Sequence, residues 1–294
     1  MIRIVRVLAP NPGVYTLEGT NTWIVGEDPA VVIDPGPDDD GHLREVARLA
    51  GPVVAVLVTH DHEDHAAGAS ALAATVGAPV RAVRLPGAAP LEDGRRFAVG
   101  GGSVEAVATP GHAADHVALW EPVTRSLFTG DAVLGRGTSF IDPPDGDLVA
   151  YLASLDRMLA LGPRTIRPGH GPVLTDAMGT LREYREHREE RERQVLEALA
   201  DGPRSVDELV ATIYADHPAD VHPLAARSVT AHLRKLEAED RAAKTGHGVG
   251  QTWALASPKT CARCGARMRG AGTYCRRCLV AMLQGPGAAD AATT

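Results

Sequence analysis

The sequence lacks any stretch of the roughly 20 consecutive apolar residues that a membrane-spanning helix needs. Its first residues also lack the apolar core and the small-residue cleavage site of a secretory signal. Aromatic residues are scarce, at 4%, yet 44% of the 294 residues are hydrophobic, which is enough to bury a core. We therefore expect a soluble, globular, cytoplasmic protein, and neither a membrane protein nor an exported one.

Cysteine is absent from most of the chain. The four cysteines form two Cys-x-x-Cys pairs near the C-terminus: Cys261, Cys264, Cys275 and Cys278. A secreted protein held by disulfides spreads its cysteines more widely, whereas pairs at this spacing are typical of tetrahedral zinc sites. We predict one structural Zn²⁺ in a zinc-ribbon-like module over residues 258–294, which ends in a disordered Gly/Ala-rich tail. Disulfides or idle thiols are the alternative.

Positive charge is scarce outside this module. The net charge is −7, and residues 258–294 carry six Lys or Arg against one Asp, so the rest of the chain sums to −12. An acidic body is a poor docking surface for nucleic acid. Only the C-terminal module has the net positive charge that attracts phosphate, so we expect any phosphate contact there.

The rest of the chain divides into two regions of different sequence character. Residues 1–175 read as short strands separated by Gly and Pro, with a hairpin over 20–36 and a Val-rich run over 53–60 that is typical of a strand buried on both faces. Helices are expected over 64–77 and 147–162. Further strand candidates are RAV, RRFAV, SVEAVATP, HVALW and RSLFTG. This order predicts an α+β sandwich of two sheets with helices outside and ligands along one edge.

From about residue 176 the sequence becomes strongly charged and helical. Residues 178–202 predict a solvated helix that links two domains. Ser205 and Glu208 have the spacing of a capping box, and two helical segments and a Gly-tipped hairpin follow. This order indicates a winged helix. We therefore predict a catalytic domain over 1–175, a linker helix and winged-helix domain over 176–257, and the four-cysteine module after it.

The segment THDHEDHAAG, directly after the buried strand, carries the strongest chemical signal. It places four metal-binding side chains within six residues: His60, His62, Asp64 and His65. His60 and His62 alternate along an extended backbone and can point to one side, whereas Asp64 and His65 turn toward a second point. The segment can therefore bind two metal ions. An accidental polar loop is the alternative. It is disfavoured because three more ligands follow strand-like runs, each beside a glycine that lets the loop bend: His112, Asp131 and His170.

The His-x-His-x-Asp-His run with its later His, Asp and His resembles the metallo-β-lactamase superfamily over about residues 10–175. The resemblance implies an αββα sandwich that holds two Zn²⁺ ions in its active site. It implies that one zinc is bound by His60, His62 and His112, that the other is bound by Asp64, His65 and His170, and that Asp131 bridges them. His62 stands where related di-iron proteins have Glu, which favours zinc and leaves manganese or iron open.

Two such ions lower the pKa of a shared water from about 15.7 to about 7, which makes a metal-bound hydroxide the nucleophile. Asp64 should orient this hydroxide as well as bind metal. His116, four residues after His112, is a candidate catalytic proton donor, and a buried structural histidine is the alternative. Asp34, at a strand end, either orients a ligand histidine or only caps a turn.

A narrower resemblance comes from the winged helix together with EGTNTWIVG, FTGDAVLGRGTSF, PGHGPVL and HREERERQVLEAL. With these segments the chain resembles, through about residue 256, the lactamase-beta-like protein two group, whose animal members are single-strand endoribonucleases. In that group the winged-helix region commonly forms a lid and wall of the active-site cleft. The resemblance implies a dinuclear-zinc phosphodiesterase that acts on single-stranded RNA, and the acidic body argues against it.

Two other functions stay open. The same metal centre attacks carbonyl carbon, so a thioester or lactone hydrolase of the glyoxalase-two kind is the enzymatic alternative. A winged-helix DNA-binding regulator is the alternative of another class. However, residues 181–257 carry eleven Lys or Arg against fourteen Asp or Glu, and a module for duplex DNA is normally basic. We expect RNA or a small molecule as substrate, and neither membrane nor duplex DNA as partner.

Overall fold

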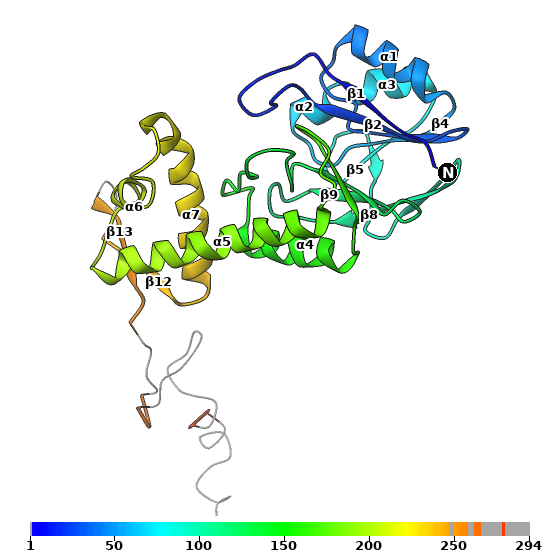
Figure 1. Cartoon of the computed structure of the whole chain (residues 1–294). Helices are drawn as coiled ribbons and strands as arrows, with labels where there is room; N and C mark the ends of the chain where they lie inside the picture. Colours follow the sequence, from blue (N-terminus) through cyan, green and yellow to red (C-terminus); the bar gives the residue numbers. More distant parts are fainter. Residues whose placement is uncertain (1, 247–249, 258–261, 266–277, 280–294) are drawn as a thin grey trace, which may run out of the picture. The chain divides into compact units, whose positions relative to one another are not determined.

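The computed structural model describes residues 2–246, 250–257, 262–265 and 278–279. Two compact units divide the chain, Met1–Arg191 and Glu192–Thr294 (Figure 1). Their boundary falls within the long helix α5, Ala177–Ala200, so the first unit includes the N-terminal part of this helix. Within the described part of the chain, no helix has the length and hydropathy needed to cross a bilayer.

Two sheets form the first unit. The six-stranded sheet is antiparallel from β1 to β3 and parallel from β3 to β6, and its strands lie in chain order: β1 Ile4–Leu8, β2 Asn21–Gly26, β3 Ala30–Ile33, β4 Val53–Leu57, β5 Val80–Ala82 and β6 Ala89–Pro90. The five-stranded sheet has the order β11-β10-β9-β8-β7 and is antiparallel except between β10 and β11: β7 Arg96–Val99, β8 Gly102–Ala108, β9 Val117–Glu121, β10 Ser126–Gly130 and β11 Thr165–Pro168. The strand candidates expected after residue 80 are confirmed.

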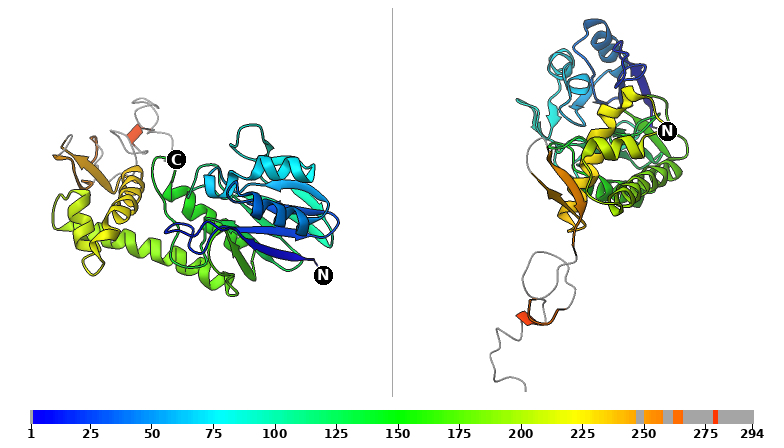
Figure 2. Two further views of the ribbon diagram at one scale, coloured as in Figure 1. Left: turned by 90° about the horizontal axis from the view of Figure 1, so that it is seen from above. Right: turned by 90° about the vertical axis from the view of Figure 1, so that its left-hand side faces the viewer.

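The two sheets pack face to face around one core. Because neighbouring residues of a strand point to opposite faces, Leu57 of β4 lies in this core, whereas Val56 points to the outer face of the six-stranded sheet. That outer face is covered by α1, Asp40–Ala50, and α3, Ala69–Val76 (Figures 1 and 2). Both faces of β4 are therefore buried from Ala55 onward, which explains the continuous apolar run there, whereas Val54 at the start of the strand is exposed.

The helix expected over residues 64–77 forms as two helices, α2, Glu63–Ala66, and α3. Gly68 lies between them. A Cβ at this position would lie 2.8 Å from both Leu43 Cδ2 and Pro37 O. The chain therefore passes too close to its neighbours for any residue but glycine. The helix is interrupted there because Gly68 N donates to Gly36 O at 3.0 Å instead of to a carbonyl of α2.

Helix α4, Leu148–Ala160, supports the loops that follow β8 and β10. Its N-cap Asp147 accepts a hydrogen bond from Ala150 N, where the sequence predicted a helix start. Ser154 Oγ donates to Pro110 O at 2.7 Å, and Tyr151 Oη donates to Ala132 O at 2.6 Å. The helix thus holds two loops of the five-stranded sheet in place.

The second unit has the order helix, helix and hairpin: α6 Val206–Ile213, a 3₁₀ turn Ala219–Val221, α7 His222–Ala238, β12 Ala242–Thr245 and β13 Thr252–Leu255. The expected capping box is confirmed, because Ser205 Oγ accepts from Glu208 N and the Glu208 carboxylate accepts from Ser205 N. Trp253 of β13 packs with Leu209 of α6 and Leu233 of α7 in one core. The winged-helix arrangement expected from the sequence is confirmed.

The C-terminal module cannot be described as a whole. Cys261 and Cys275 lie outside the described residues, whereas Cys264 is exposed and Cys278 is buried. The structural Zn²⁺ over residues 258–294 therefore stays a prediction.

Candidate metal centre

Seven side chains of the metal-binding type meet where four loops leave the C-terminal ends of strands. One loop follows β4 of the six-stranded sheet, and the others follow β8, β10 and β11 of the five-stranded sheet. The four loops supply, in this order, His60, His62, Asp64 and His65, then His112, then Asp131, then His170. All seven residues expected from the sequence thus lie at one edge of the sandwich.

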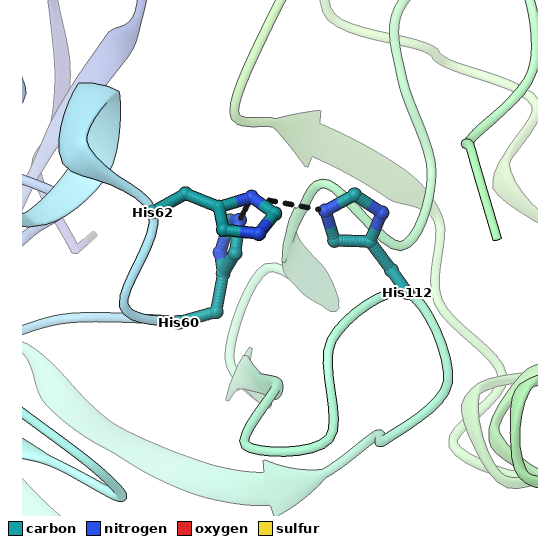
Figure 3. A group of neighbouring side chains, drawn as sticks. All are labelled: His60, His62 and His112. Atoms are coloured by element: carbon teal, nitrogen blue, oxygen red, sulfur yellow. Dashed lines mark hydrogen bonds between the residues drawn. The ribbon is translucent and has the colours of Figure 1, made fainter. Parts of the chain in front are cut away.

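Three of these histidines form a first ligand group (Figure 3). His62 Nδ1 lies 2.9 Å from His60 Nε2 and 3.4 Å from His112 Nε2. One ligand atom from each of the three lies within 4.8 Å of the others, a spacing that suits a single ion. His60 and His62 approach from the loop after β4, and His112 faces them from the loop after β8.

A second ligand group lies beside the first. His170 Nε2 is 3.0 Å from Asp64 Oδ2 and 3.1 Å from His65 Nε2. His65 and His170 are fully buried, whereas the Asp64 side chain is 29% exposed. Two imidazoles and one partly exposed carboxylate form a ligand set that leaves a side open to solvent and substrate.

Asp131 lies between the two groups. Its Oδ1 is 3.3 Å from His65 Nε2 and 3.4 Å from His170 Nε2, whereas its Oδ2 is 3.9 Å from His112 Nε2. Oδ1 is buried without a hydrogen-bond partner. One carboxylate oxygen therefore faces each group, which is the arrangement that a bridging ligand needs.

The outer nitrogen of each buried imidazole has a fixed partner. His112 Nδ1 donates to Phe140 O at 2.7 Å, and His170 Nδ1 donates to Gly19 O at 3.2 Å. Because a carbonyl only accepts, both rings must carry their proton on Nδ1, and their Nε2 lone pairs point inward. Lone pairs that converge with an unpartnered carboxylate oxygen fit bound cations, so these residues fit two metal ions.

Asp34 fixes His65 in the same way. Its Oδ2 lies 2.9 Å from His65 Nδ1 and accepts a hydrogen bond from Thr59 Oγ1 at 2.9 Å, and its Oδ1 accepts one from Thr59 N at 2.8 Å. Asp34 is buried and has a left-handed backbone with φ of 49°. Asp34 therefore does more than cap a turn, because its carboxylate holds the turn and also contacts a ligand histidine.

Charge and burial oppose each other in this centre. Burial raises the pKa of Asp131, but His65 and His170 outweigh it and hold that pKa well below its usual range. Burial likewise lowers the pKa of His65, but Asp131 and Asp34 raise it well above the usual value. Burial and the neighbouring His65 depress the pKa of His60. The Asp131 carboxylate is thus ionised at neutral pH, which suits divalent cations.

His116 is buried beside the first group. Its Nδ1 lies 2.9 Å from Thr109 Oγ1, its Nε2 has no hydrogen-bond partner, and its ring centroid is 5.2 Å from that of His60. Burial lowers the pKa of His116 to about 3, so the ring is neutral at pH 7. Its role as a proton donor stays a prediction.

The glycines beside Asp131 and His170 also allow a close approach of the backbone to other side chains. A Cβ at Gly130 would lie 2.6 Å from Thr59 Oγ1 and 2.8 Å from His116 Nε2. A Cβ at Gly169 would lie 2.6 Å from His65 Cε1 and 2.9 Å from Asp131 Oδ1. A side chain at Gly169 would therefore displace two ligands, and one at Gly130 would displace Thr59 and His116, which lie beside the first ligand group.

Two residues that the sequence did not indicate, Ser139 and Phe140, support His112 from outside. Ser139 Oγ lies 3.3 Å from His112 Nδ1, and the Ser139 carbonyl accepts a hydrogen bond from Arg188 of α5. Phe140 contributes its backbone carbonyl, which any residue type could supply. No side-chain pattern could therefore have identified it.

Comparisons with known proteins agree with this geometry. Residues 15–98 and 79–170 match the family model described as Metallo-beta-lactamase superfamily, and residues 205–253 match the Beta-lactamase associated winged helix domain. The chain is 33% identical to the Beta-lactamase-like protein 2 homolog of Drosophila melanogaster, over 81% of this chain and 89% of that protein. It is 35% identical to the Atrochrysone carboxyl ACP thioesterase of Aspergillus chevalieri, over 74% of this chain and 75% of that protein.

Solved structures show the same fold. A beta-lactamase domain protein from Burkholderia ambifaria has a TM-score of 0.74 at 21% identity, and the match covers 87% of this chain and 91% of that one. A metallo-beta-lactamase family protein from Thermus thermophilus has a TM-score of 0.70 at 21% identity, with coverage of 86% and 98%. At 21% identity these matches show the fold of the chain and nothing of its activity.

Proposed function

Because the chain belongs to the metallo-β-lactamase superfamily and is a hydrolase of that fold, we propose that it is a dinuclear zinc enzyme that hydrolyses an acyl thioester. The observation that carries the proposal is the pair of ligand groups that share Asp131. Imidazole and carboxylate ligands in this number suit zinc, and manganese or iron is bound by similar sets.

The proposed ligand assignment follows the two groups. His60, His62 and His112 would hold one ion, Asp64, His65 and His170 would hold the other, and Asp131 would contact both. When bound, the two ions supply a nucleophile by lowering the pKa of water and polarise the substrate carbonyl. In the hydrolysis the oxygen of water bonds to the acyl carbon, the C–S bond breaks, and the thiol leaves with a proton.

Asp64 is the residue of this chain placed to handle that proton. It is the more exposed of the two ligand carboxylates, with 29% of the side chain accessible against 15% for Asp131. Burial raises the pKa of Asp64, but the neighbouring His170 and His65 outweigh it and hold that pKa below its usual value. An ionised carboxylate accepts a hydrogen bond from the attacking water and can pass the proton to the leaving sulfur.

Charge favours an acyl substrate over a polyanion. Residues 1–175 contain 13 Arg and no Lys against 21 Asp or Glu. Two arginines on loops of the first unit already have acidic partners: Arg136 is paired with Glu18, and Arg84 is paired with Asp145 at 3.0 Å. These arginines are neutralised by partners, whereas phosphodiester binding requires cations that face the substrate.

Single-stranded RNA is the second candidate substrate. The resemblance to the endoribonuclease group and the 33% identity to the Drosophila melanogaster relative support it. The basic residues that would contact phosphate lie mainly in the C-terminal segment after residue 257. RNA cleavage would use the same two ligand groups, so the substrate must be decided by assay.

The test compares the zinc-loaded chain with Asp131→Asn and His112→Ala on a panel of acyl thioesters and on fluorescent single-stranded RNA. We expect thioester hydrolysis whose kcat/KM falls at least about 100-fold in both variants, because several kcal/mol of charge stabilisation is lost. His217→Ala is the matched control, since His217 is exposed and belongs to neither ligand group. Equal thioester turnover by wild type and variants would overturn the proposal, and RNA cleavage without thioester turnover would replace it by the second candidate.

A further inference from the structure

Two aromatic side chains stand exposed where two loops of the first unit meet. Tyr15 is 60% exposed and Phe140 is 37% exposed, although both are large and apolar in their rings. Their ring centroids are 5.9 Å apart and their planes meet at 77°. We call this pair the aromatic rim.

The loop that carries Tyr15 is fastened to the second ligand group. It runs from Ala9 to Thr20, and its tip is closed by the bridge between Gly13 and Leu17. Thr20 Oγ1 donates to Asp64 O at 2.9 Å, and the preceding carbonyl accepts from His170 Nδ1. Any movement of this loop is therefore coupled to Asp64 and His170.

The loop that carries Phe140 is fastened to the first ligand group. The Phe140 carbonyl accepts from His112 Nδ1 at 2.7 Å, and the neighbouring Ser139 is buried. The same two loops are also joined by the ion pair of Glu18 with Arg136. The aromatic rim thus joins the two loops that contact the two ligand groups, and one of its members, Phe140, holds a ligand histidine through its own carbonyl.

The geometry of the rim suits a flat partner. Two rings at nearly a right angle form a corner, in which a planar group packs face-on against one ring and edge-on against the other. The ion pair beside the rim leaves no net charge to attract an anion. Exposed aromatic surface next to a reaction centre is a common feature of substrate-binding sites.

We propose that the aromatic rim is the binding site for the acyl group, and that this acyl group is planar and aromatic. The inference rests on the proposed thioester hydrolysis and adds the class of acyl group to it. A nucleobase also stacks on exposed aromatic rings, but its phosphates would meet arginines that are already paired.

The test measures kcat/KM for 2-naphthoyl and hexanoyl thioesters of one thiol, N-acetylcysteamine, with the full zinc-loaded chain. Tyr15→Ala should lower kcat/KM for the naphthoyl thioester about tenfold, which is the size of one aromatic contact, and leave the hexanoyl thioester within about twofold. Tyr15→Phe keeps the ring and should retain the naphthoyl rate. Val123→Ala is the control for loss of an exposed apolar side chain, since Val123 is 58% exposed between β9 and β10.

Binding of the product acid separates this inference from the proposed function. By titration calorimetry, 2-naphthoate should bind more tightly than hexanoate, and Tyr15→Ala should weaken naphthoate about tenfold even if no thioester is turned over. Equal losses for both acyl groups, or no loss with either, would overturn the inference while leaving thioester hydrolysis intact. Loss of RNA cleavage in Tyr15→Ala with unchanged naphthoate binding would instead assign the rim to nucleobases and overturn the inference.

Discussion

At the level of single residues, Asp34 shows how a residue outside the ligand groups positions the ligands. One buried carboxylate accepts hydrogen bonds from Thr59 N and Thr59 Oγ1 and contacts His65 Nδ1. It fixes the start of the loop that carries four ligands and orients one of them. Outer partners of this kind are worth about 10- to 100-fold in metal affinity.

We therefore expect Asp34→Asn to weaken zinc binding about 10- to 100-fold. Asn keeps an acceptor for Thr59 and tolerates the left-handed backbone, but its amide NH₂ would face the Nδ1–H of His65. Competition with a chelating indicator measures the affinity. Asp34→Ala should in addition lower the free energy of unfolding by about 3–5 kcal/mol, because it leaves buried donors unpaired. The exposed Asp38→Asn is the control, and unchanged zinc affinity in Asp34→Asn would contradict the expectation.

The ligand residue types were readable from the sequence because metal chemistry depends on side-chain type and on spacing. The partners of their outer nitrogens were less readable. Asp34 could be suggested from its place at a strand end, but the carbonyls of Gly19 and Phe140 carry no signal of their own. Backbone acceptors are set by the course of the loops, and these depend on tertiary packing.

At the level of helices and strands, α5 supports the centre from a distance. Arg188 is 4% exposed, donates to the Ser139 carbonyl and lies with its guanidinium carbon 5.4 Å from the Tyr151 ring centroid. Ser139 precedes Phe140, whose carbonyl holds His112. The helix that the sequence marked as a linker thus also positions a ligand loop of the first unit.

Replacing Arg188 by Met should lower the free energy of unfolding of the first unit by about 1–3 kcal/mol, since the buried Ser139 carbonyl loses its donor. Met fills part of the space against Tyr151, so the loss reports the hydrogen bond more than the packing. Urea denaturation followed by tryptophan fluorescence measures it. The control is Arg182→Met, at an exposed position of the same helix, which should change the free energy of unfolding by less than about 0.5 kcal/mol. Equal effects of the two variants would show that the hydrogen bond from Arg188 to the Ser139 carbonyl does not stabilise the first unit.

The strands of the five-stranded sheet, the winged helix and its capping box could be predicted because each has a local pattern. Helix α1 was missed although Leu43, Val46 and Ala50 have helical spacing and are buried. The polar residues at the start of α1 obscured this helical spacing in the sequence. The break at Gly68 could not be predicted, because it depends on a hydrogen bond from Gly68 N to the carbonyl of Gly36, which is distant in sequence.

For the molecule as a whole, two units with separate cores imply two unfolding transitions. Trp23 and Trp120 belong to the core of the first unit, and Trp253 belongs to that of the second. The seven ligands all belong to the first unit. Metal binding should therefore stabilise one transition and leave the other in place.

We expect removal of metal by a chelator to lower the Tm of the first unit by about 10 °C. A ligand at about 1,000 times its Kd stabilises by about 4 kcal/mol, and each kcal/mol is worth about 2–4 °C in a unit of this size. Differential scanning calorimetry measures both transitions, and Trp253→Phe assigns the fluorescence change to the first unit. A double variant, Cys261→Ser with Cys275→Ser, controls for zinc held by the C-terminal cysteines. An unchanged first transition would argue against bound metal in the seven-ligand centre.

The placement of the ligands in both sheets has a mechanical consequence. His60 and His62 follow a strand of one sheet and His112 follows a strand of the other, and Asp64 and His170 are divided in the same way. Each bound ion would therefore act as a cross-link between the halves of the sandwich, closing loops of about 50 and about 100 residues much as a disulfide does. The same ions that activate water would tie together the two layers whose interface positions them.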